Sequence, residues 1–195
     1  LNTPADSLSN FNRKIVSKYK AGLGFNYLKG YLGEEVLNKS IKEFYQKNKL
    51  LISKISNFKE ILTKNTDKDI KWFFKDYIKT SKKIDYAIEE VKKTKDSLKV
   101  TIKNKRNITT PVALYGIKNN EIIYKKWFSS IKDTLTTGIP KGVFDQLVLN
   151  YEKIYPEYNT LNNYYNTDKK FFNKPLKLSF IKDAKAPNYN QVFYQ

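Results

Sequence analysis

The sequence contains no cysteine, no histidine and no methionine. Without cysteine the chain can form neither a disulfide nor a thiolate nucleophile. Without histidine it lacks the usual general base near neutral pH and the usual zinc ligand. A catalytic triad of the Ser-His-Asp type or a histidine-based zinc site therefore cannot be built from this chain alone.

Arginine is also scarce, with only Arg13 and Arg106, although the formal net charge is +18. Direct readout of nucleic-acid bases depends heavily on the arginine fork, and the lysines are spread along the whole chain. We interpret the charge as a solvated lysine surface and expect no nucleic-acid partner. The alternative, a free-standing basic nucleic-acid binder, predicts an affinity that falls steeply with salt.

Long apolar runs are absent as well, and none approaches the roughly 20 residues needed to cross a bilayer. We therefore expect no transmembrane segment, and no signal peptide is recognisable. The 195 residues do include 15 Tyr and 12 Phe, which is enough for a packed core. Because the chain starts with Leu1 and ends just after an aromatic run, we expect it to be a piece of a longer protein.

Apolar residues recur with the period of a helix in the N-terminal part of the chain. The pattern predicts a long helix from Asn12, a second helix that starts at the acidic pair Glu34 and Glu35, and a short third helix capped by Asn57. A fourth helix is expected over residues 67–78, started by Asp67 or Asp69. Its apolar face contains Ile70, Phe73, Phe74 and Tyr77, and Trp72 is expected to reach the side of a neighbouring helix.

The period then changes from 3.6 to 2, which is typical of strands. Residues 84–88 and 98–102 alternate on either side of the turn KKTKDS, and further strand candidates are PVALYGI, EIIYKKWF, DTLTTGI and FDQLVLN. Short strands at this spacing predict a small antiparallel sandwich. The segment KTSKK between the last helix and the first strand is too short to be a flexible linker, so we expect rigid docking of the two parts.

The predicted fold class is α+β and multidomain: an N-terminal all-α helical bundle, an antiparallel β-sandwich and an irregular C-terminal tail. The expected boundaries are residues 1–80 for the helical part, 81–155 for the sandwich and 156–195 for an extended tail.

Two segments carry a resemblance to a known family. The stretch YLKGYLGEEVLNKSIKEFYQK, followed after a short helix by DKDIKWFFKDYIKTSKKIDYAIEEV, resembles the gluzincin zinc aminopeptidases of the membrane alanyl aminopeptidase type. In that family a helix ending in "YLG" precedes a helix with an acidic start, and a motif close to "GKDLSWFFDQW" leads into a small β-sandwich. The resemblance covers most of the chain and is nearest to large envelope peptidases of Bacteroidetes, which continue with a stretch like LNNYYNTDKKFFNKPLKLSF.

The resemblance implies that residues 1–80 are the C-terminal part of a thermolysin-like peptidase domain and that the tail leads to a further domain. In the family, two His and one Glu hold zinc, a second Glu activates the attacking water, and a downstream Tyr stabilises the oxyanion. Since this chain has no histidine, zinc is expected in the parent protein, upstream of Leu1. The chain itself is expected to hold no metal or cofactor and to be inactive alone.

One catalytic element of the family could lie in this chain. The oxyanion tyrosine of the family stands in a pattern like Y-x-K-G, and the corresponding stretch here is SKYKAGLGFNYL. Lys20 takes the lysine position and Lys18 the tyrosine position, so Tyr19 is one residue late, about 100° away on a helix. Either a local irregularity restores Tyr19 or the parent lacks this group; alternatively, Tyr19 simply packs on Leu23.

Our leading hypothesis is a non-autonomous C-terminal fragment of a zinc metallopeptidase, aminopeptidase-like, which completes one wall of the cleft. Its partners would be the remainder of the parent polypeptide and, in the parent, a peptide substrate. The resemblance places it in the cell envelope or periplasm, membrane-associated through the parent. The alternative is a scaffold or interaction module from a catalytically inactive peptidase relative, which the displaced Tyr19 motivates.

Overall fold

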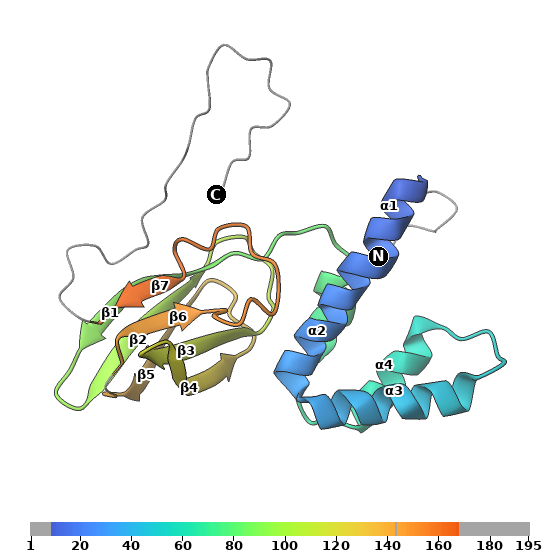
Figure 1. Ribbon diagram of the computed structural model, residues 1–195, viewed down its shortest axis with the longest axis horizontal. Helices are drawn as coiled ribbons and strands as arrows, with labels where there is room; N and C mark the ends of the chain where they lie inside the picture. Colours follow the sequence, from blue (N-terminus) through green and yellow to red (C-terminus); the bar gives the residue numbers. More distant parts are fainter. Residues whose placement is uncertain (1–8, 143, 168–195) are drawn as a thin grey trace, which may run out of the picture.

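The computed structural model describes residues 9–142 and 144–167. It shows a helical lobe followed by two antiparallel sheets, so the predicted α+β class is confirmed. The two lobes lie end to end along the long axis (Figure 1).

The helical lobe begins with one long helical column made of α1 (Asn10–Lys14), the π-helix η2 (Ile15–Lys20) and α2 (Ala21–Leu32). Gly33, with φ +102°, ends α2 and lets the chain turn directly into α3 (Glu34–Asn48). α4 (Ile55–Lys64) returns beside α3. The buried face of α2, with Tyr27, Leu28, Tyr31 and Leu32, forms the centre of the lobe.

Two details of the helical predictions need correction. Asn57 does not cap α4: the helix begins two residues earlier, at Ile55, and the Asn57 side chain accepts a hydrogen bond from the Lys54 backbone N–H. The predicted helix over 67–78 is shorter and wider, because Phe73–Tyr77 forms the π-helix η3. Asp69 does mark its start, since its carboxylate accepts a hydrogen bond from the Lys71 backbone N–H.

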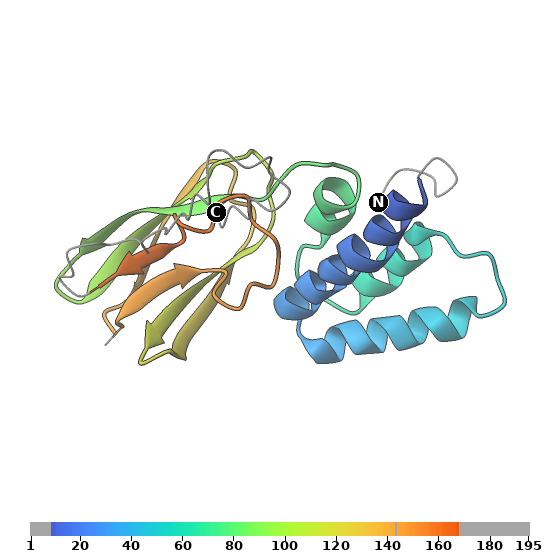
Figure 2. The same ribbon diagram turned by 45° about the horizontal axis from the view of Figure 1, so that its top comes forward.

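The sandwich contains the six strands that the sequence predicted and a seventh that it did not. The first sheet has the order β1-β2-β5, and the second has the order β4-β3-β6-β7 (Figure 2). All neighbouring strands pair antiparallel. The first sheet consists of β1 (Tyr86–Lys93), β2 (Ser97–Asn104) and β5 (Thr134–Pro140). The second sheet consists of β4 (Glu121–Phe128), β3 (Val112–Lys118), β6 (Gln146–Leu149) and β7 (Tyr164–Asn166). Fully buried side chains of both sheets form the core, among them Val100, Ile102, Leu114, Leu147 and Leu149.

Strand β7 lies beyond residue 156, inside the segment predicted to be an irregular tail. It pairs with β6 through Leu147 and Val148. The remainder of the predicted tail, residues 168–195, lies outside the described residues.

The two lobes are held together by aromatic side chains around Tyr27. The Tyr27 ring stacks on Tyr155 with centroids 4.4 Å apart and lies 4.5 Å from Trp72. Its hydroxyl donates a hydrogen bond to the carbonyl of Pro111, directly before β3. One residue earlier, the Asn26 amide donates to the Ile154 carbonyl. The two lobes therefore share a buried contact, to which Trp72 of the aromatic segment contributes through Tyr27; that the docking is rigid stays a prediction.

Candidate functional site

A groove of about 550 Å³ lies where the helical column meets the beginning of the sandwich. Tyr19 lines it from η2 and is 68% exposed. Leu23 lines the same groove and is also exposed. Tyr19 is therefore exposed at the groove, where its hydroxyl could donate a hydrogen bond to a ligand. The other lining residues are Ile15, Lys20, Tyr77, Ser81, Lys82, Lys83, Ile84, Pro156, Glu157 and Tyr158.

The wall beneath Tyr19 is fixed by a close crossing of α2 with η3. A Cβ atom on Gly24 would lie 2.7 Å from the Tyr77 ring and 3.2 Å from the Phe73 ring, so only glycine allows this approach. The Tyr77 hydroxyl donates a hydrogen bond of 2.9 Å to the Lys20 carbonyl at the end of η2. Burial raises the pKa of Tyr77 to about 12, which extends the range in which this hydroxyl remains a donor to more alkaline pH.

The opposite wall contains Glu157, a carboxylate with three hydrogen-bond donors. The Tyr86 backbone N–H donates at 3.0 Å, the Asn150 amide at 3.1 Å and the Asn163 amide at 2.7 Å. Burial nevertheless raises the pKa of Glu157 to about 7, and the nearby Asp85 adds to this. A carboxylate held by three N–H groups acts first as a brace between strand β1 and the loop that follows β6.

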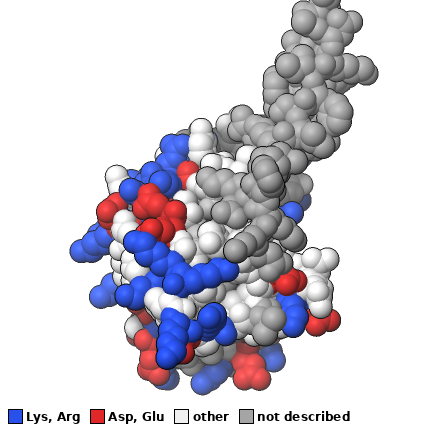
Figure 3. All heavy atoms as spheres, turned by 90° about the vertical axis from the view of Figure 1, so that its left-hand side faces the viewer, with Lys and Arg blue, Asp and Glu red and all other residues white. Residues whose placement is uncertain are grey.

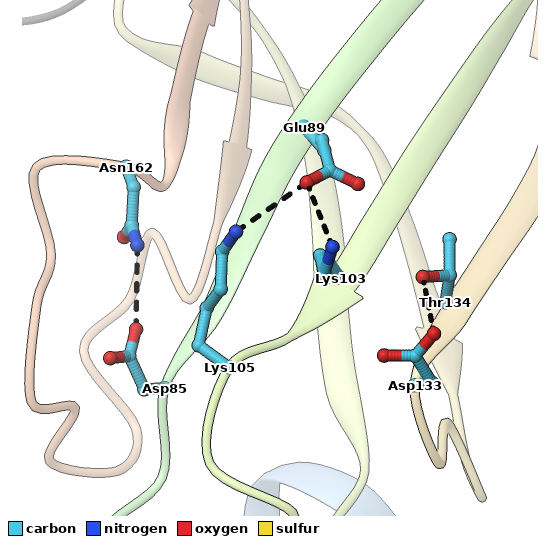
Figure 4. A network of polar contacts seen from close by, with 7 residues as sticks. All are labelled: Asp85, Glu89, Lys103, Lys105, Asp133, Thr134 and Asn162. Atoms are coloured by element: carbon cyan, nitrogen blue, oxygen red, sulfur yellow. Dashed lines mark hydrogen bonds and ion pairs between the residues drawn. The ribbon is translucent and has the colours of Figure 1, made fainter.

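The rim of the groove is cationic. The Arg106 guanidinium lies 3.8 Å from the centre of the Tyr158 ring, and the Lys83 ammonium lies 4.9 Å from the same ring. Arg106 also forms an ion pair of 3.6 Å with the buried Asp85. The Asn162 side chain lies beside the same carboxylate (Figure 4). The groove thus combines an exposed phenol, a protonatable carboxylate and basic side chains.

Sequence reasoning singled out Tyr19 but missed Glu157. The glutamate stands in the aperiodic stretch YPEYN, and nothing in that stretch indicates that Asn150, Asn163 and Tyr86 converge on it. Only the fold brings these distant residues together.

Two pairs of glutamates that are adjacent in the sequence, Glu34–Glu35 and Glu89–Glu90, lie on the surface. Glu34 forms an ion pair of 3.0 Å with Lys29. Glu89 pairs with Lys103 and Lys105 on the first sheet (Figure 4), and Glu90 pairs with Lys92. None of these carboxylates lines the groove.

The donor set for a metal is poor. Within residues 9–142 and 144–167, no group of three or more His, Cys, Asp or Glu side chains is placed to hold a metal ion.

The same residues, 9–142 and 144–167, include no helix that is long and apolar enough to span a membrane. On the sandwich end, Lys and Arg side chains extend across the middle of the face, and groups of Asp and Glu lie above and below them (Figure 3).

A second hollow, of about 520 Å³, lies between α2, α3 and α4. Phe25, Ile41, Phe44, Ile55 and Phe58 make most of its lining apolar. These side chains can make apolar contacts but supply no acid, base or nucleophile.

Comparison with known proteins gives a likeness of fold. No family model matches the chain, and no curated protein matches it. Among solved structures, the crystal structure of Legionella pneumophila aminopeptidase A in complex with aspartic acid matches with a TM-score of 0.61 at 15% identity. The chain is similar in fold to part of an aminopeptidase. The match covers 73% of this chain and 17% of that one, so it extends over more than either lobe alone.

Proposed function

We propose that this chain is the C-terminal portion of an aminopeptidase-like zinc metallopeptidase of the gluzincin type. The observation that carries the proposal is the fold match to an aminopeptidase, which spans 73% of the chain but only 17% of the larger protein. The YLG and WFF segments fall on the end of α2 and on η3, the elements that form the groove and the junction. In this proposal residues 1–80 complete the peptidase domain, the bracing sandwich extends from residue 81 through strand β7, and the residues after β7 lead onward.

Exposed apolar side chains on the first helical column support this proposal. Phe11, Ile15 and Leu23 are apolar and exposed along α1, η2 and α2, and Ile15 and Leu23 line the groove. Exposed apolar side chains at this density mark a surface that another body covers. In the proposal, that body is the zinc-binding part of the parent polypeptide, and the peptide substrate lies between it and the groove.

Zinc does not fit the residues of this chain. There is no histidine in the sequence, and the described carboxylates do not cluster. Any zinc of the parent would be held by residues outside this chain, and no step of this chain's own chemistry passes through the metal. The contribution of this chain would be Tyr19 as a hydrogen-bond donor to the oxyanion and the rigid wall that holds it.

The π-helix η2 bears on the displacement of Tyr19. A π-helical turn accommodates one more residue than an α-helical turn, and one residue is the displacement that separates Tyr19 from the family pattern. This irregularity favours an active parent. The presence of Lys18 at the tyrosine position favours the second candidate, a scaffold from an inactive peptidase relative in the cell envelope.

The test is to assay the chain and the longer protein on aminoacyl-anilide substrates, each with and without a chelator. We expect no hydrolysis by the chain and chelator-sensitive hydrolysis by the longer protein. Strong, chelator-sensitive activity of the chain alone would refute the proposal, and an inert longer protein would favour the scaffold.

A further inference from the structure

The loop between α3 and α4 carries three neighbouring apolar side chains that belong to no core cluster. Leu50 and Ile52 are completely exposed, and Leu51 is 68% exposed. We call these three residues the apolar tip. The loop lies at the end of the molecule farthest from the sandwich (Figure 1), so the apolar tip protrudes from the surface.

Neither packing nor turn chemistry explains the apolar tip. Leu50 has φ +67°, in the left-handed region that glycine and asparagine adopt far more readily than leucine. If the turn required only this backbone conformation, glycine or asparagine at position 50 would adopt it at a lower conformational cost than leucine. Three consecutive aliphatic side chains in water are also unfavourable, so they indicate an apolar environment outside the chain.

Lysines surround the apolar tip. Lys47 and Lys49 precede it and Lys54 follows it, and all three are exposed. Lys47 pairs with Glu43 at 2.8 Å, whereas Lys49 and Lys54 form no ion pair within the part of the chain that the structure describes. An apolar projection flanked by Lys49 and Lys54 is complementary to a membrane surface. The apolar side chains can enter the hydrocarbon, and the lysines can contact the anionic headgroups.

We propose that the apolar tip inserts into the interface of a membrane that contains anionic lipids, with Lys49 and Lys54 against the headgroups. A bilayer fits a convex projection because it has no fixed shape, whereas a protein partner would have to supply a matching cavity. The proposal depends only on the exposure and charge of this loop. It stands or falls independently of the aminopeptidase-like role.

The experiment is co-sedimentation of the chain with phosphatidylcholine vesicles, prepared with and without phosphatidylglycerol. The variant Leu51→Ser/Ile52→Ser removes the two apolar side chains that follow Leu50. The matched control is Ile122→Ser/Ile123→Ser, which removes two exposed apolar side chains of β4. We expect the wild type and the control to bind vesicles that contain phosphatidylglycerol. The affinity of the loop variant for the same vesicles should be lower by a factor of about ten or more.

A second variant, Lys49→Ser/Lys54→Ser, separates charge from insertion. We expect its binding to be weaker at low salt and less dependent on salt than that of the wild type. A third variant, Leu51→Trp, reports insertion directly through a blue shift of its emission when anionic vesicles are added. Because all these residues are on the surface, circular dichroism should show the same folded spectrum for every variant.

Three results would overturn the proposal. One is a wild type that does not bind anionic vesicles at low salt. Another is equal binding by the loop variant and the control. The last is a wild type that self-associates and becomes monomeric in the loop variant, since this would assign the apolar tip to a protein contact.

Discussion

Tyr19 tests the proposed chemistry at the scale of one residue. It is an exposed phenol on the wall of the groove. If it donates to an oxyanion in the longer protein, Tyr19→Phe should lower kcat by about 10²-fold or more and change KM little, because the bond forms in the transition state. Steady-state kinetics on an aminoacyl-anilide measure this. Tyr45→Phe, which alters a comparably exposed tyrosine on α3, should leave both constants unchanged; an equal effect of both variants would contradict the assignment.

Glu157 predicts a pH dependence of stability. Its pKa in the folded chain is raised from 4.5 to about 7, so the folded state holds a proton that the unfolded state has released. The stabilisation is complete below pH 4.5 and is lost as the pH rises through 7, amounting to at most about 3 kcal/mol. Thermal melts from pH 4.5 to 8 should show this decline in the wild type and not in Glu157→Gln.

Glu152 supplies a control of opposite sign. Burial tends to raise its pKa, but hydrogen bonds from Lys125 and Tyr115 outweigh burial and hold the pKa below its usual value. Its stabilisation is present above the usual value and is lost as the pH falls through the folded one. Glu152→Gln should therefore leave the decline between pH 4.5 and 7 intact. The assignment to Glu157 fails if Glu157→Gln retains the decline or Glu152→Gln abolishes it.

At the scale of elements, the crossing of α2 and η3 can be tested with two glycines of the same helix. Gly22→Ala meets open space and should stabilise the chain by about 0.5–1 kcal/mol through helix propensity. Gly24→Ala would press against the Tyr77 and Phe73 rings and should destabilise it by about 1–3 kcal/mol. Urea unfolding measures both. A Gly24→Ala variant as stable as Gly22→Ala would show that the crossing tolerates a methyl group.

The same scale shows how far the sequence predicts the structure. Strand β2 could be predicted because alternating residues such as Val100 and Ile102 face the core on one side. Strand β3 is buried at consecutive positions, and it could be predicted as a short apolar run bounded by turn signals. The widened turns η2 and η3 could not, since their geometry depends on contacts such as that between Tyr77 and Lys20, which are distant in the sequence. Strand β7 has only three half-buried residues, and its pairing with β6 rather than its own pattern makes it a strand.

The candidate site was predictable only in part, for a related reason. Tyr19 could be proposed because its neighbourhood resembles the family pattern of Tyr, Lys and Gly, and its catalytic role stays a prediction. Glu157 acquires its properties from Tyr86, Asn150 and Asn163, which approach it only after the sandwich has formed. A single sequence contains the first kind of signal and not the second.

At the scale of the whole molecule, the contacts around Tyr27 join the two lobes, and we expect the lobes to unfold as one cooperative unit. Tyr27→Phe removes the hydroxyl that bonds to the Pro111 carbonyl and should cost about 1–2 kcal/mol. Hydrogen exchange should then accelerate by a similar factor in α2 and in β1–β2, because unfolding of either lobe exposes the shared rings of Tyr27, Trp72 and Tyr155. Tyr45→Phe should change neither. Faster exchange in one lobe alone would mean that the lobes unfold separately. The walls of the groove between them would then not be held rigidly.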